Sequence, residues 1–207
     1  MSGPETPSIV ITGVGFVTPL GRGPEEVLRR LAAGEVRVAP PRGFDAAPFA
    51  CHVCAEIPDF DGGQYVTEPK TLRLMNRDAQ LAVAAARLAL ADANAMVGRT
   101  YPAADVALYG ATGSAGLPLA EVDRLIRESA GPDGHFDLAR FGDTALKRVR
   151  PVLSFKILNN MSICFVSIFA GIQGANAVYN PWEGQGAHAI AAGLAAIRCG
   201  DARCALV

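Results

Sequence analysis

The sequence predicts an α/β protein whose strands pair mainly in parallel. Apolar runs that end in Gly-rich turns alternate along the chain with segments of helical spacing, which is the pattern of strand–helix–strand units. The first run, SIVITGVGFVTPLG (residues 8–21), is apolar without alternation and is typical of a strand buried on both faces. No repeat and no linker divides the 207 residues. We therefore expect one domain over residues 1–207.

The first half of the chain predicts two helices separated by a long, mostly irregular segment. EEVLRRLAAGE (residues 25–35) has helical spacing and a stop at Gly34, whereas residues 35–70 are rich in Pro, Asp and Gly and favour one short strand, at CHVCAEI (residues 51–57). A longer helix is expected over residues 70–94, with Asn94 as its stop. Its apolar stripe comprises Leu74, Ala82, Ala85, Leu88 and Ala89.

In the second half of the chain, predicted strands and helices continue to alternate. DVALYGATGSAG (residues 105–116) predicts a strand that enters a Gly-rich turn, LPLAEVDRLIRES (residues 117–129) begins a helix, and residues 129–150 are polar and loop-like. Residues 158–180 mix helix and strand signals. GAHAIAAGLAAIRCGD (residues 186–201) is a helix ended by Gly200, and RCALV at the end of the chain begins a strand. The Gly-rich turn has neither a Lys-Ser/Thr pair nor dinucleotide spacing, so no nucleotide site is expected.

Composition excludes several functional classes. The chain is 50% hydrophobic with a formal charge of -1 and has no dense Lys/Arg stripe, which disfavours a nucleic-acid surface. No apolar run is long enough for a membrane span, and MSGPETPS is unlike a signal peptide, so we expect a cytoplasmic protein. Five scattered cysteines indicate reduced thiols rather than disulfides. CHVC lacks a second ligand pair and resembles one face of a strand, so neither a metal nor a cofactor is expected.

Several segments, in order and at similar spacing, resemble the N-terminal half of a β-ketoacyl synthase. They are IVITGVGFVTPLG, RLMNRDAQLAVAAARLALADA, GATGSAGL, LNNMSICFVSIFAGIQGAN and GAHAIAAGLAAIRCGDARCALV. The resemblance implies a thiolase-like fold, in which two βαβαβαββ halves pack into a layered α/β/α/β/α body and two bodies form a dimer. In active members a cysteine at the turn before the GAHAI-like helix receives an acyl chain from an acyl carrier protein. Two histidines of the C-terminal half then support decarboxylation and condensation.

The turn NPWEGQGAHAI (residues 180–190) departs from this pattern. Pro181, Trp182 and Glu183 stand where a Thr-Ala-Cys-like triplet is expected, so Glu183 occupies the position of the catalytic nucleophile. A carboxylate suits the positive end of a helix dipole, but it is a poor acyl carrier. We therefore expect Glu183 not to be competent for condensation. No cysteine nearby in the sequence aligns with the nucleophile position of the family. The nearest ones are Cys164, Cys199 and Cys204.

The chain also ends at Val207, before the part of the family that bears the two histidines. We therefore expect the C-terminal half to be absent, and His52, His135 and His188 do not stand in the family's histidine positions. The Ala-rich helix over residues 186–198 would then keep an exposed apolar face. Such a face on a protein usually indicates a partner.

Three hypotheses follow. The first is a non-condensing subunit like a chain-length factor, which forms a heterodimer with an active β-ketoacyl synthase in fatty acid or polyketide biosynthesis and shapes its acyl tunnel. Ser114, Leu117 and Met161 are then candidate substrate-binding residues that line the tunnel or the interface. The second is an enzyme, a malonyl-carrier-protein decarboxylase or another acyltransferase-type member of the family. The third is a degenerate protein without activity.

Overall fold

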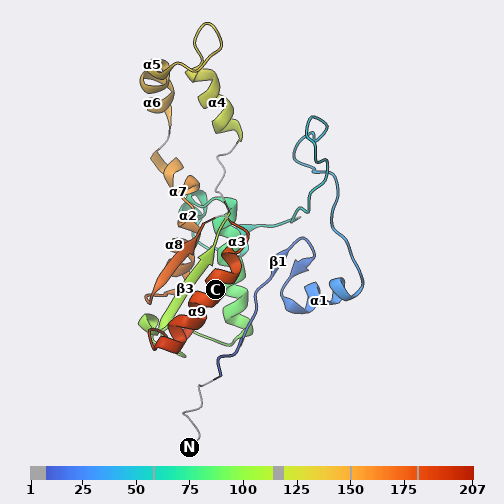
Figure 1. Ribbon diagram of the computed structural model, residues 1–207, viewed down its shortest axis with the longest axis vertical. Helices are drawn as coiled ribbons and strands as arrows, with labels where there is room; N and C mark the ends of the chain where they lie inside the picture. The colour runs from blue at the N-terminus through green and yellow to red at the C-terminus, as the bar shows by residue number, and fades with distance from the viewer. Residues whose placement is uncertain (1–7, 58, 114–118, 150, 181) are drawn as a thin grey trace, which may run out of the picture.

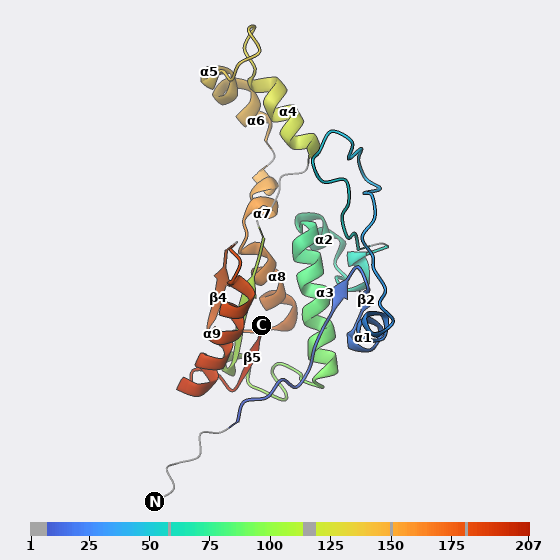
Figure 2. The same ribbon diagram turned by 45° about the vertical axis from the view of Figure 1, so that its right-hand side comes forward.

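A three-stranded parallel sheet lies at the centre of the computed structural model, which describes residues 8–57, 59–113, 119–149, 151–180 and 182–207. Helix α9 covers one face of the sheet, and α8 covers the other, with α3 packed outside α8 (Figure 1; Figure 2). Helices α4, α5 and α6 stand away from this body in both views. The arrangement is the predicted α/β architecture.

The strands and helices have the following bounds. The strands are β1 (Val17–Thr18), β2 (Gly21–Arg22), β3 (Val106–Ala111), β4 (Asn176–Tyr179) and β5 (Cys204–Leu206). The α-helices are α1 (Pro24–Ala32), α2 (Pro69–Leu74), α3 (Arg77–Asp92), α4 (Leu119–Ser129), α5 (Leu138–Arg140), α6 (Leu146–Arg148), α7 (Ser154–Ile157), α8 (Met161–Ala170) and α9 (Gln185–Cys199). Shorter helical turns are η1 (Gly62–Gln64), η2 (Ala103–Asp105), η3 (Phe141–Ala145) and η4 (Pro151–Leu153).

Strand β3 is the middle strand, in the order β4-β3-β5, and pairs in parallel with both neighbours. Leu108 lies opposite Asn176 of β4 and Leu206 of β5. The sequence VALYGA suits a central position because its first three residues are buried on both faces. The strands expected within residues 105–116 and at the end of the chain are therefore confirmed.

The main core lies between β3, α8 and α3. Val106 and Leu108 of β3 pack with Ile163 and Phe165 of α8 and with Val83 of α3. Helix α8, MSICFVSIFA, is strongly apolar. Among the described residues, no single helix is long and apolar enough to cross a membrane; only the bent pair Pro151–Ile157 and Met161–Ala170 passes that test, by length and composition, when counted together.

Helix α9 buries one face and leaves the other open. Ala189, Gly193 and Ala196 are buried against the sheet, and Gly193 allows Val207 to approach the helix closely. On the outer face the side chain of Ile190 is 62% exposed. The helix ends as predicted at Gly200, which adopts a left-handed conformation with φ 81°. The expected exposed apolar face is thus present in the chain.

The strand predicted over residues 8–21 is wrong for most of its length. Only Val17–Thr18 and Gly21–Arg22 form strands, as a short antiparallel hairpin, and residues 8–16 run beside α3 without a strand partner. Gly13 and Gly15 face the backbone of α3, while Val10 and Ile11 are 69% and 85% exposed. An apolar β-branched run forms a strand only where the edge of another strand is free to pair with it, and no strand among the described residues pairs with residues 8–16.

Three further expectations are corrected. The single helix expected over residues 70–94 is divided into α2 and α3, because Asn76 caps α3 by accepting a hydrogen bond from the amide of Ala79 at 2.8 Å. The segment CHVCAEI forms only a bridge between Cys54 and Ala39. Residues 129–150 are not loop-like throughout, since Asp137 caps the helical run of α5, η3 and α6.

Candidate functional site

The turn that joins β4 to α9 carries the position predicted for the nucleophile. Strand β4 ends at Tyr179, and α9 begins at Gln185 with Gly184 as its N-cap. A β-carbon at position 184 would overlap the indole ring of Trp182, so this close approach requires glycine. The amide of Trp182 donates to Oε1 of Gln185 at 3.1 Å, which closes the turn on itself.

Glu183 lies in this turn, immediately before the N-cap of α9, and its side chain is exposed. Within the described part of the chain its carboxylate makes no hydrogen bond or ion pair. The first amide groups of a helix lack partners within the helix, and the macrodipole favours a negative charge beside them. The carboxylate of Glu183 is solvated, and a carboxylate is a weak nucleophile.

Three aromatic rings surround the same turn. The imidazole of His188 lies parallel to the phenol ring of Tyr179, with ring centroids 5.6 Å apart and planes inclined by 11°. Its other neighbour is Trp182, at a centroid distance of 4.9 Å and an angle of 49°. The sequence predicts a packed or solvent-touching imidazole at position 188, and the structure shows a ring that is both. Nothing in the sequence pattern indicated the stack, because its members come from a strand, a turn and a helix.

Two other predicted segments reach this turn. The side-chain amide of Asn159 donates to Oδ1 of Asn180 at 3.3 Å and so joins the NNM segment to the end of β4. The amide of Thr112 donates to the carbonyl oxygen of Tyr179 at 3.1 Å, which places the start of the Gly-rich turn beside it. The segments therefore converge at the carboxyl ends of β3 and β4. In α/β proteins, ligand sites characteristically lie at this edge of the sheet.

The candidate substrate-binding residues have different outcomes. Met161 begins α8, is partly buried, and packs against the main core. Ser114 and Leu117 lie outside the described residues. The tunnel-lining role of all three remains a prediction.

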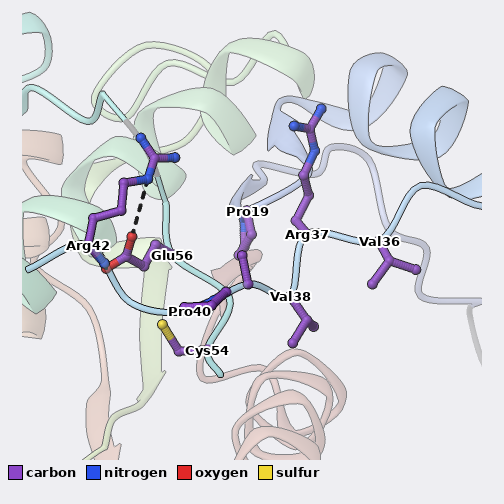
Figure 3. Close-up of a pocket in the computed structure, with 9 residues that line it drawn as sticks. Pro19, Val36, Arg37, Val38, Pro40, Arg42, Cys54 and Glu56 are labelled. Carbon is purple, nitrogen blue, oxygen red and sulfur yellow. Dashed lines mark hydrogen bonds and ion pairs between the residues drawn. The ribbon is translucent and has the colours of Figure 1, made fainter. Parts of the chain in front are cut away.

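A separate hollow of about 230 Å³ lies between the excursion of residues 35–57 and the β1–β2 hairpin (Figure 3). Pro19, Val38 and Cys54 contribute to its lining, and the guanidinium of Arg42 approaches the carboxylate of Glu56 at 3.7 Å on one side. Of the predicted site residues that the structure describes, neither Glu183 nor Met161 lines this hollow. Among the described residues, no group of three or more His, Cys, Asp or Glu side chains is arranged to hold a metal ion.

The comparison with protein families decides the identity. The sequence profile described as "Beta-ketoacyl synthase, N-terminal domain" matches residues 6–207. The chain belongs to this family. The resemblance stated from the sequence is therefore confirmed over nearly the whole chain.

Known members of the β-ketoacyl synthase family are similar in sequence. The 3-oxoacyl-[acyl-carrier-protein] synthase 2 of Synechocystis sp. is 27% identical over 176 residues, which cover 85% of this chain and 38% of that relative. A relative from Streptomyces violaceoruber, named for the granaticin polyketide, is 41% identical over 111 residues, or 53% of this chain and 26% of that protein. The chain thus spans well under half the length of these relatives.

Solved structures of the family confirm the thiolase-like fold. The ishigamide ketosynthase/chain length factor superposes with a TM-score of 0.73 at 26% identity, covering 93% of this chain and 44% of that chain. A β-ketoacyl synthase from Burkholderia phymatum gives a TM-score of 0.70 at 24% identity, with the same coverage, and so supports the fold alone. Both matches extend over nearly all of this chain.

None of the five cysteines of this family member belongs to the turn between β4 and α9. All five are free, and Cys199 ends α9, roughly 21 Å along the helix from its first residue. Cys164 is partly buried in α8, and burial raises the pKa of the Cys204 thiol in β5. A raised pKa keeps a thiol protonated and unreactive. For Cys204, burial therefore favours a packing role over a reactive one.

Proposed function

We propose that this chain is the N-terminal portion of a ketosynthase-like subunit that carries no acyl chain itself and pairs with a condensing β-ketoacyl synthase. In the resulting heterodimer it helps to shape the acyl tunnel of the partner, which receives its substrate from an acyl carrier protein. The observation that carries the proposal is the exposed carboxylate of Glu183 in the turn before α9. An acyl group bound to Glu183 as a mixed anhydride would hydrolyse far more readily than a thioester. It would therefore be lost to water before it could be condensed.

Two other features support a partner. The outer face of α9 presents Ile190 to solvent beside alanines, and apolar surface of this kind usually marks an interface. A ketosynthase/chain length factor is also among the structures that superpose on the chain. In the proposed complex, Ser114, Leu117 and Met161 line or gate the tunnel.

Co-purification tests the proposal. An affinity-tagged form of the chain is expected to retain a condensing synthase from its native cells, and the complex is expected to elongate an acyl group that the tagged chain alone does not elongate. The variant Glu183→Ala is expected to leave elongation by the complex unchanged. Elongation by the chain alone, or recovery of the chain without any synthase, contradicts the proposal.

Decarboxylation of malonyl-loaded carrier protein is a second activity that Glu183 allows us to test. An oxygen-bearing side chain can occupy the nucleophile position without being acylated, although a negative charge there opposes the developing enolate. If Glu183 takes part, Glu183→Gln raises the rate of carbon dioxide release and Glu183→Ala abolishes it. Equal rates for all three proteins remove this residue from the mechanism.

A further inference from the structure

His188 contacts two aromatic rings at the start of α9. Its ring centroid lies 5.6 Å from that of Tyr179 and 4.9 Å from that of Trp182. Both separations are within the roughly 6 Å over which a cation is attracted to the face of an aromatic ring. Protonation of the imidazole would therefore place a positive charge beside two aromatic rings, within the range of a cation–π attraction.

The stack connects three parts of the site. Tyr179 ends β4, Trp182 lies in the turn beside Glu183, and His188 belongs to the first turns of α9. The indole ring also covers Gly184, and the amide of His188 donates to the carbonyl oxygen of Gly184 at 3.0 Å. Any force that draws the rings together thus holds the turn against the helix.

We propose that His188 is a pH-sensitive clamp, which tightens the turn carrying Glu183 when its imidazole is protonated and loosens it when the imidazole is neutral. This regulation goes beyond the proposed function and does not depend on it, because it rests on the ring geometry alone. At pH values where histidine is half protonated, small changes in proton concentration would alter the rigidity of the turn.

Other titratable groups lie on the elements around the stack. Helix α9 packs against β3, β4 and β5, whose titratable side chains are Tyr109, Tyr179 and Cys204. Glu183 precedes the helix, and Arg198 and Cys199 lie at its far end. Carboxylic acids ordinarily titrate below about pH 5, and thiols, phenols and guanidinium groups above about pH 8. A transition between these limits is therefore assigned to His188 only when it is retained in variants of the other two histidines, His52 and His135.

Tryptophan fluorescence tests the clamp directly, because the chain contains a single tryptophan and it belongs to the stack. A stacked imidazolium quenches indole emission more strongly than a neutral imidazole does. Emission of the full chain is expected to fall in one step between about pH 8 and about pH 5. The step is expected to disappear in His188→Gln and to remain in the matched controls His52→Gln and His135→Gln. Absence of the step in the wild type, or its persistence in His188→Gln, overturns the proposal.

Amide hydrogen exchange of the wild-type chain provides a second test that needs no substitution. After correction for the intrinsic pH dependence of exchange, the opening equilibrium measured at the His188 amide is expected to be roughly two- to fivefold smaller at the acidic end of the range, the effect of an exposed cation–π contact. An opening equilibrium that is equal at both ends of the range contradicts the clamp, even if the fluorescence changes.

Discussion

Gly184 lies directly beneath the indole ring of Trp182, so closely that a β-carbon at position 184 would overlap the ring. Gly184→Ala is therefore expected to displace Trp182 from His188 and to change both the intensity and the wavelength of tryptophan emission. Because alanine is also a poor N-cap, the variant is expected to be less stable by roughly 1 kcal/mol.

Gly186 provides the matched control for this substitution. It lies two residues further along α9, where a β-carbon would meet open space. Gly186→Ala is expected to leave the emission spectrum unchanged and to stabilise the helix by roughly 0.5 to 1 kcal/mol. If Gly184→Ala retains the wild-type spectrum, the described packing of Trp182 is wrong.

Gly174, just before β4, faces the carbonyl oxygens of Val106 and Ala104. A methyl group at this position would push β4 away from β3, so Gly174→Ala is expected to lower the free energy of unfolding by roughly 1 to 3 kcal/mol. Urea denaturation measures this change. Gly142→Ala, where a β-carbon meets nothing, is expected to show no loss, and equal midpoints for the two variants would contradict the close approach of the strands.

Burial raises the pKa of the Cys204 thiol, which gives folding a pH dependence in alkaline solution. The folded state holds this proton more tightly than the unfolded state does. The associated stability is therefore fully present below the ordinary thiol pKa of about 8.5 and is lost as pH rises through the folded value. Denaturation at a series of alkaline pH values should show this decline, with a smaller slope in Cys204→Ala. The exposed Cys199 supplies the control: Cys199→Ala should keep the wild-type slope, and a wild-type slope in Cys204→Ala would refute the assignment.

Local sequence signals predicted those elements whose form is set by nearby residues. The end of α1 and the end of α9 follow from Gly34 and Gly200, both in left-handed conformations, and Asn94 adopts a positive φ just after α3. The apolar run of β3 identifies the central strand because its side chains are buried on both faces. At the two glycines and at Asn94, the residue type itself tolerates the positive φ that the helix end requires.

Features that depend on distant contacts were not predictable in this way. The apolar stripe of α3 gives no sign of a break at Asn76, whose side chain caps α3 and also donates to the carbonyl oxygen of Lys156, 80 residues away. The sequence of residues 8–16 is typical of a buried strand, yet whether it forms a strand depends on the presence of a neighbouring strand with a free edge. The candidate site shows the same contrast. The placement of Glu183 in the turn before α9 could be predicted from the sequence, but the stacking of Tyr179, Trp182 and His188 could not.

The central claim is that position 183 does not receive an acyl group. Intact-mass spectrometry after incubation with acyl-loaded carrier protein, in the presence of the co-purified synthase, tests it most directly. We expect the acyl mass on the synthase and none on this chain, with the same result for Glu183→Ala. An acyl adduct on this chain that maps to Glu183 and disappears in Glu183→Ala would contradict the account.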